Sequence, residues 1–98
     1  MAYQIIVKKR FTHKVQKVLT YIEKEWSHKT AKEFLLKIDR RFDLLSKQPY
    51  AGALSVRVKD VRGLLISRHN RMYYKIKGDK VIILNMYDTR RNPKKSSF

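Results

Sequence analysis

Chemically useful side chains alternate along residues 71–77 of the chain. Arg71, Tyr73 and Lys75 occupy every second position, so an extended backbone presents them together on one face of a strand. Guanidinium and ammonium groups bind anions, and a phenol ring among them offers a surface on which a nucleic-acid base can stack. Burying such groups in a core is costly, so we assign them to a face that no other layer covers. The pattern predicts a surface for an anionic partner.

Few titratable groups accompany this surface. A histidine titrates near neutral pH, which makes His69 a candidate acid or base, although a histidine beside Asn70 is also typical of a solvated turn. Asp88 is a candidate base, but its nearness to Arg90 favours an ion pair or a cap at a strand end. The histidines lie far apart without a carboxylate at ligand spacing, and no glycine-rich phosphate loop occurs. We therefore expect neither a metal ion nor another cofactor.

The whole chain is strongly basic. Lysine and arginine total 24 against 8 aspartate and glutamate residues, a formal net charge of +16 at pH 7. Both halves carry the excess, with 12 basic and 5 acidic residues in 1–51 and 12 basic and 3 acidic residues in 52–98. Solubility requires far less charge, so the body itself is expected to bind an anionic partner such as nucleic acid, an acidic protein or a membrane surface.

The elements that position these residues begin with a short strand and a helical hairpin. Residues 3–7 are rich in strand-forming types, and two apolar stripes with helical spacing follow. Thr30 and Glu33 have capping-box spacing, which predicts that the second helix begins near Thr30, and Pro49 predicts its end. The stripes, which we expect in the core, are Phe11, Val15, Val18, Leu19, Ile22 and Trp26, then Ala31, Phe34, Leu35, Ile38, Phe42 and Leu45.

A strand pattern follows the hairpin. Gly78-Asp79 predicts a tight turn between the last two strands, and His69-Asn70 is a weaker turn signal before them. The predicted strands cover residues 61–67, 71–77 and 81–87. The order β-α-α-β-β-β predicts an α+β fold in which the helical hairpin packs on one face of a mainly antiparallel sheet.

The chain is expected to form one domain over residues 1–98, with a flexible tail at residues 94–98. It contains no cysteine, which excludes disulfides and thiolate metal sites. No apolar run is long enough to cross a bilayer, and the first residues lack the pattern of a signal peptide. We therefore expect a cytoplasmic protein that does not enter a membrane.

These features together make the chain resemble the RelE/ParE superfamily of toxins from type II toxin–antitoxin systems, over essentially its whole length. The resemblance rests on the element order, the size, the basicity and several short segments. These are Lys-Gln-Pro at 47–49, Arg62 near the start of the next strand, His-Asn-Arg-Met-Tyr-Tyr at 69–74, and the Arg90-Arg91-Asn92-Pro93 end. The resemblance implies a growth inhibitor that is silenced by a cognate antitoxin, which we expect to be acidic.

The superfamily implies two alternative activities. ParE-like members bind DNA gyrase and trap it on DNA without being enzymes, whereas RelE-like members are ribosome-dependent endoribonucleases that cut mRNA. For the gyrase alternative, the implied target-binding residues are Lys59, Arg62, Arg71, Tyr73, Arg90 and Arg91. For the nuclease alternative, the implied catalytic residues are Arg71 and Arg91, with His69 and Tyr87 as acid–base candidates, Tyr87 only if it faces the open side of the sheet.

We favour the gyrase alternative, because it does not require an acid and a base beside the arginines. Residues 92–98 hold neither a tyrosine nor a histidine, and no glutamate follows Glu33. A third alternative is a basic nucleic-acid-binding module without toxicity, since strand tyrosines among cations can stack bases. The absence of an RNP-like signature and of a Gly-x-x-Gly loop counts against that alternative.

Overall fold

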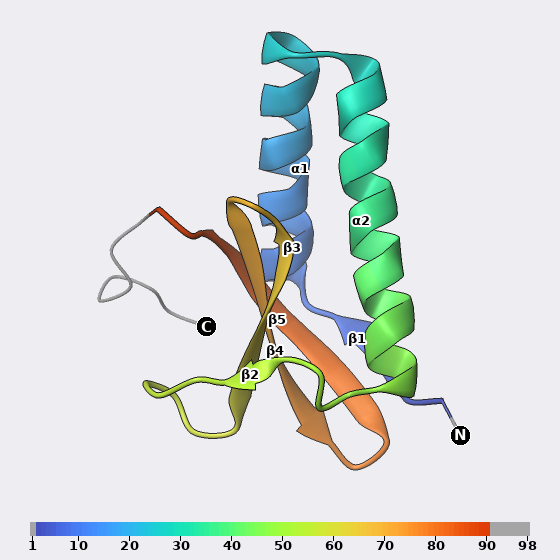
Figure 1. Ribbon diagram of the computed structural model, residues 1–98, viewed down its shortest axis with the longest axis vertical. Coiled ribbons are helices and arrows are strands. Elements are labelled where there is room, and N and C mark those ends of the chain that lie inside the picture. Colours follow the sequence, from blue (N-terminus) through green and yellow to red (C-terminus); the bar gives the residue numbers. More distant parts are fainter. Residues whose placement is uncertain (1, 91–98) are drawn as a thin grey trace.

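The computed structural model describes residues 2–90, which form two helices and five strands. In chain order these are β1 (Gln4–Val7), α1 (Lys9–Glu25), α2 (His28–Lys47), β2 (Ala53–Leu54), β3 (Val61–Ser67), β4 (Asn70–Lys77) and β5 (Lys80–Asp88) (Figure 1). The predicted α+β fold is confirmed, with the short strand β2 as an addition to the predicted order. Arg91 and the tail predicted to be flexible lie outside the described residues.

A capped turn joins the two helices. Ser27 is the N-cap of α2, and its Oγ accepts the backbone N–H of Thr30 at 3.1 Å. The helix therefore begins at His28, earlier than the predicted start near Thr30, because the Ser27 hydroxyl satisfies one of its first N–H groups. It ends at Lys47, before Pro49 as predicted. In the described part of the chain, no helix combines the length and apolar character needed to span a membrane.

The closed end of the hairpin extends beyond the sheet (Figure 1). Trp26 lies at this end as the C-cap of α1 and is 73% exposed, so its predicted place in the core is wrong. Its backbone leaves helical geometry, with φ −124° and ψ −89°, and its side chain therefore departs from the apolar stripe. Leu35 of α2 is also predicted in the core, and its 42% exposure shows that this prediction is wrong.

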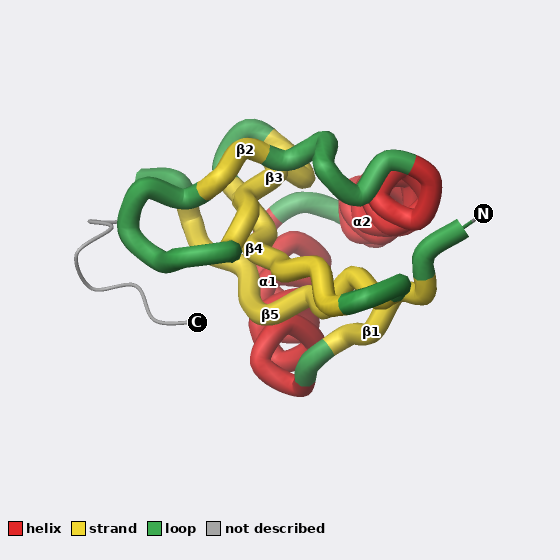
Figure 2. The backbone as a smooth tube through the Cα atoms, turned by 90° about the horizontal axis from the view of Figure 1, so that it is seen from below, coloured by secondary structure: helices red, strands yellow, loops and turns green. Residues whose placement is uncertain are grey.

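The strands form one mixed sheet in the order β1-β5-β4-β3-β2. β1 runs parallel to β5, and the remaining neighbours are antiparallel, which confirms a mainly antiparallel sheet. Figure 2 shows the twist of this sheet, with β1 and β2 at its opposite edges. The predicted turn between β4 and β5 is also confirmed, and Gly78 adopts a φ of 61° there, a conformation that glycine reaches without strain.

The helices pack on one face of the sheet, and the core lies between the two layers. On the sheet side, Met72 and Tyr74 of β4 are fully buried. The phenol of Tyr74 also ties the connection after α2 to the sheet. It accepts the N–H of Gly52 and donates to the C=O of Pro49, both at 2.8 Å.

Candidate functional site

Three side chains gather on the face of the sheet that the helices leave uncovered: Arg71 and Tyr73 of β4, and Tyr87 of β5. Arg71 lies opposite Tyr87 in the register of the two strands. The rings of Tyr73 and Tyr87 meet edge to face, with their centroids 6.0 Å apart. The burial of Met72 and Tyr74 in the core confirms that Arg71 and Tyr73 occupy the open face. We call Arg71, Tyr73 and Tyr87 the open-face cluster.

A β-bulge in β5 brings Tyr87 to this face. Asn85 lies opposite Tyr73, and Leu84 before it has no counterpart in β4 within the described sheet. The extra residue shifts the alternation of β5 by one position. Asn85 and Tyr87 consequently join the open face, whereas Met86 enters the core.

Asn85 fixes the position of the Tyr87 hydroxyl. It is 3% exposed, so both ends of its amide need hydrogen-bond partners. Its Nδ2 donates to the Tyr87 Oη at 3.2 Å, and its Oδ1 accepts the backbone N–H of Met86 at 2.8 Å. The phenol oxygen of Tyr87 is therefore held by a side chain that solvent hardly reaches.

Gly63 of β3 leaves room for the cluster. It lies opposite Tyr73, and a Cβ built at this position lies 3.2 Å from both the Arg71 Cδ and the Tyr73 Cε1. Both distances are shorter than ordinary van der Waals contact. A glycine inside a strand often marks such a close approach, and a side chain here would displace both residues.

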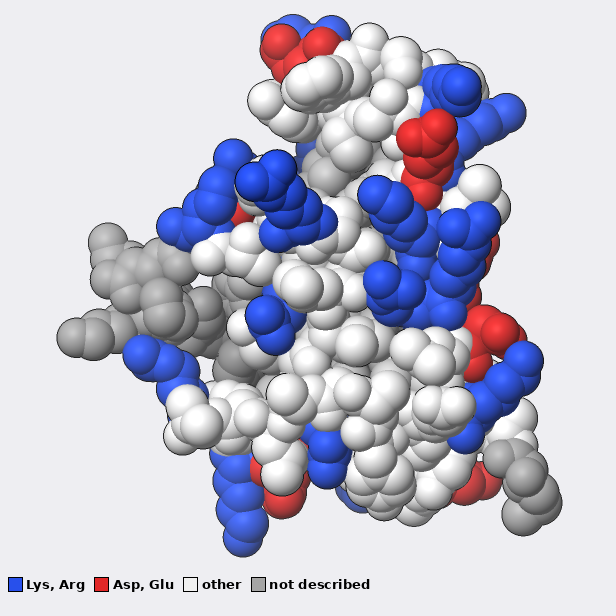
Figure 3. All heavy atoms as spheres, in the orientation of Figure 1, with Lys and Arg blue, Asp and Glu red and all other residues white. Residues whose placement is uncertain are grey.

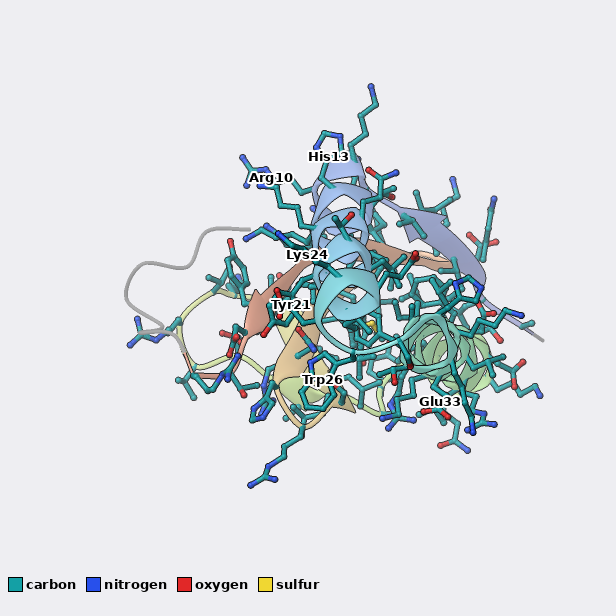
Figure 4. The ribbon with its side chains drawn as sticks, turned by 90° about the horizontal axis from the view of Figure 1, so that it is seen from above. Arg10, His13, Tyr21, Lys24, Trp26 and Glu33 are labelled. Carbon is teal, nitrogen blue, oxygen red and sulfur yellow. The ribbon has the colours of Figure 1, made fainter. Side chains whose placement is uncertain are left out.

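Basic side chains of α1 approach the cluster from the edge of β5. The Lys14 Nζ lies 4.8 Å from the centroid of the Tyr87 ring, within the range of a cation–π contact. Arg10, His13 and Lys17 line a hollow together with Lys14, Asn85 and Tyr87. Figure 4 shows Arg10 and His13 extending from α1 on the side away from α2. The spacing of Lys14 and Lys17 from Arg10, which places the three on one side of a helix, is the signal in the sequence for this group.

Two of the predicted target-binding residues lie away from the cluster. Arg62 is opposite Tyr74 and thus on the other face of the sheet, where its guanidinium donates to the C=O of Gly52 at 2.8 Å and lies 5.0 Å from the centroid of the Tyr50 ring. These contacts give Arg62 a role in the fold. Lys59 lies in the loop before β3, at the end of that strand remote from Arg71.

Asp88 and Arg90 form the ion pair at the end of β5 that the sequence predicts. The carboxylate accepts the Arg90 backbone N–H at 2.8 Å and two guanidinium N–H groups at 3.0 and 2.6 Å. These hydrogen bonds hold the pKa of Asp88 well below its usual range and raise the pKa of Arg90. Asp88 is therefore an engaged anion and a poor base. His69 lies in the neighbouring exposed turn, where its C=O accepts the Thr89 N–H at 2.9 Å.

The open-face cluster is suited to binding an anion. Arg71 supplies a permanent positive charge with several N–H donors, and the two phenol rings supply flat apolar faces and hydroxyl groups. Among residues 2–90, no three His, Cys, Asp or Glu side chains come close enough to hold a metal ion. Of the predicted acid–base candidates, Tyr87 lies in the cluster and His69 in the turn that precedes β4.

Known proteins share this fold. The family model described as "ParE toxin of type II toxin-antitoxin system, parDE" matches residues 5–93. Among curated proteins, no significant match to the sequence is found. A chain of the chromosomal ParDE TA system from P. aeruginosa is similar, with 17% identity, coverage of 89% of this chain and 96% of that chain, and a TM-score of 0.75.

Two further solved structures come from E. coli. A RelE toxin mutant in the free state has 15% identity, coverage of 92% of this chain and 86% of that chain, and a TM-score of 0.61. A chain of the DinJ–YafQ toxin–antitoxin complex has 12% identity, coverage of 90% and 93%, and a TM-score of 0.60. The structural similarity, with TM-scores from 0.60 to 0.75, shows a common fold, and the family model adds a match at the level of sequence. The chain therefore belongs to the ParE toxin family of type II toxin–antitoxin systems, within the RelE/ParE superfamily.

Proposed function

We propose that this toxin arrests bacterial growth by binding DNA gyrase through the open-face cluster. The composition of the cluster supports the proposal, since an arginine beside tyrosine rings is typical of the residues that dominate protein interfaces. Within the described residues it contains no carboxylate or histidine, and the nearby Asp88 is engaged by Arg90. A protein that only traps its target needs no proton transfer, and apart from its two phenols the cluster as defined offers no group for it, so this composition favours binding over catalysis.

The proposal includes a cognate antitoxin of acidic character. Two of the similar structures are described as a ParDE TA system and as a toxin–antitoxin complex. The net charge of +16 on this chain gives an acidic, partly disordered segment a strong electrostatic reason to fold onto it. Binding over the open-face cluster would block Arg71 and Tyr73 and silence the toxin.

Purified DNA gyrase provides the direct test. We expect the chain to inhibit supercoiling and to accumulate cleaved DNA. Arg71→Ala should raise the half-inhibitory concentration about 30-fold, the effect of losing an interface residue worth about 2 kcal/mol. Arg40→Ala, an exposed arginine of α2, is the matched control and should change potency less than about twofold. Failure of the unmodified chain to inhibit, or equal potency of the two variants, would count against the proposal.

Ribosome-dependent mRNA cleavage is the second candidate function, and the position of Tyr87 favours it. The bulge places this phenol beside Arg71, and Asn85 holds its hydroxyl in place. Induction of the chain in bacteria, with pulse labelling of protein and DNA synthesis, separates the candidates. Rapid loss of translation with cut mRNA, abolished by Tyr87→Phe, would replace the gyrase proposal. Filamentous cells with a DNA-damage response and intact mRNA would support it.

A further inference from the structure

We propose that a groove between α1 and the edge of β5 binds the phosphate backbone of a single-stranded nucleic acid. We call it the basic groove and define it by the residues that line it: Arg10, His13, Lys14 and Lys17 of α1, and Asn85 and Tyr87 of β5. The inference does not depend on the gyrase proposal, because the basic groove shares only Tyr87 with the open-face cluster and is tested without gyrase.

The topology of the sheet creates this groove. β1 ends at Val7, opposite Ile83, so within the described sheet no strand pairs with the β1 side of β5 beyond that point. The chain then turns into α1 at Lys9, and the helix runs beside the unpaired part of β5. Two adjoining hollows of about 240 and 290 Å³ result, and both are lined by Lys14, Lys17 and Tyr87.

Cations outnumber carboxylates among the described residues that line this groove. The lysines and arginines lie over both the helices and the sheet on the face drawn in Figure 3. Among the described residues that line the two hollows, Asp88 is the one acidic side chain, and Arg90 already binds it. Within residues 2–90, Arg10, Lys14 and Lys17 make no ion pair with a carboxylate. The other seven acidic residues are Glu23, Glu25, Glu33, Asp39, Asp43, Asp60 and Asp79, and none of them lines either hollow.

Arg10 and the two lysines before it also weaken the start of α1. Lys8, Lys9 and Arg10 surround the positive end of the helix dipole, and the first turn carries no acidic residue. Lys8 is the N-cap and makes no side-chain capping bond within the described residues. Proteins commonly tolerate such unfavourable charges at a helix start where the charges serve a function. Cations that no carboxylate of the described residues pairs with are therefore best explained by an anion from outside the chain.

The arrangement along α1 favours a nucleic-acid strand over an acidic peptide. Arg10, Lys14, Lys17, Tyr21 and Lys24 fall on one stripe of the helix, because their spacing follows its period of 3.6 residues. Figure 4 shows Arg10, Tyr21 and Lys24 on the same side of α1. Regularly spaced cations suit the repeating phosphates of a strand, and phenol rings among them suit base stacking, as at Tyr21, which is 60% exposed. A run of carboxylate side chains alone would leave this aromatic surface without a contact.

Fluorescence anisotropy with a labelled 12-nucleotide single-stranded DNA of mixed sequence tests the proposal at several salt concentrations. The double variant Lys14→Ala/Lys17→Ala removes two cations of the basic groove. Lys29→Ala/Lys32→Ala is the matched control, with the same charge and the same spacing on exposed positions of α2. We expect the groove variant to bind at least about tenfold more weakly and to lower the slope of log K against log salt by about 1.4, at about 0.7 for each lost phosphate contact.

The control should change affinity less than about twofold and leave the slope unaltered. Absence of saturable DNA binding, or the same loss in both double variants, overturns the proposal, because the binding would then be absent or spread over the whole surface. A 12-residue glutamate peptide is the competing probe. If it binds as tightly as the DNA, and with the same dependence on Lys14 and Lys17, the groove is a peptide site and the proposal fails.

Discussion

Removing one hydroxyl from the core, with Tyr74→Phe, is expected to destabilise the fold strongly. The substitution keeps the fully buried ring and deletes only the phenol oxygen. That oxygen accepts the N–H of Gly52 and donates to the C=O of Pro49, both at 2.8 Å. Each bond contributes about 0.5–1.5 kcal/mol, and a buried N–H left without a partner costs ~1–3 kcal/mol, so we expect a loss of about 2–4 kcal/mol.

Urea unfolding followed by far-UV circular dichroism measures this loss. A domain of this size has an m-value of about 1–2 kcal/mol/M in urea, so the midpoint should fall by about 2 M. Tyr50→Phe is the matched control, since Tyr50 is 62% exposed and the loss of its hydroxyl should change the free energy of unfolding by less than about 0.5 kcal/mol. Equal midpoints for the two variants would refute the reasoning that the Tyr74 hydroxyl anchors the connection after α2.

Burial raises the pKa of Tyr74, which adds a pH signature to this prediction. The hydrogen bond from Gly52 and the charge of Arg62 act in the opposite direction, but burial has the larger effect. An unfolded tyrosine ionises near pH 10, whereas folded Tyr74 keeps its proton to higher pH. Its contribution to stability is therefore complete below about pH 10 and is lost as the pH rises through the folded pKa. The difference between the unmodified chain and Tyr74→Phe should shrink over that range, and a constant difference would contradict the raised pKa.

Two further predictions concern the open-face cluster and the start of α1. Gly63→Val adds a branched side chain where a Cβ alone lies 3.2 Å from Arg71 and Tyr73. Growth inhibition on induction should therefore fall at least about tenfold, while circular dichroism shows an intact fold. Full toxicity would mean that the arrangement of the cluster is unimportant. Lys8→Asp places an acceptor at an N-cap whose backbone is already extended, with φ −81° and ψ 153°. The new cap and the more favourable interaction with the helix dipole should together raise the free energy of unfolding, measured by urea unfolding, by about 1–2 kcal/mol. An unchanged value would contradict the account of this helix end.

Local patterns in the sequence are sufficient to predict the elements of this fold except the two-residue strand β2. Alternation along residues 71–77 predicts β4, because a strand with one covered face must separate its apolar and charged side chains. Gly78 predicts the following turn, because its positive φ suits glycine. The ion pair of Asp88 and Arg90 is also predictable from a local pattern, because residues two apart at a strand end lie within reach of each other.

The open-face cluster depends on a feature that alternation does not contain. Strict alternation from Val81 would turn Asn85 and Tyr87 toward the core, because all three would share one face of β5. The bulge at Leu84 reverses this, and Tyr87 reaches the open face. From the sequence alone, this orientation of Tyr87 could be stated only as a condition. The apolar run before Asn85 fits either phase, so the sequence gives no signal for the bulge.

Arg62 and the basic groove show a second limit of sequence-based prediction, because their contacts join segments that are far apart in the sequence. Arg62 precedes Gly63 in a strand that borders the open-face cluster, but its guanidinium binds the C=O of Gly52 in a connection that only the folded chain brings near. Lys14 and Lys17 look like solvent-exposed lysines in the helical pattern. Their proximity to Tyr87 follows from the early end of β1, which leaves α1 beside an unpaired edge.

The two proposed binding surfaces meet at Tyr87 and share one electrostatic consequence. The Tyr87 ring contacts Tyr73 of the open-face cluster and lies under the Lys14 ammonium of the basic groove. A net charge of +16 opposes folding through self-repulsion, and the cations at the start of α1 add to that cost. An anionic partner that binds the folded chain and not the unfolded chain stabilises it by mass action. On both proposals, then, some of the charges that weaken the free toxin, such as Arg10, also bind its partners, and neutralisation by an acidic antitoxin would also stabilise the fold.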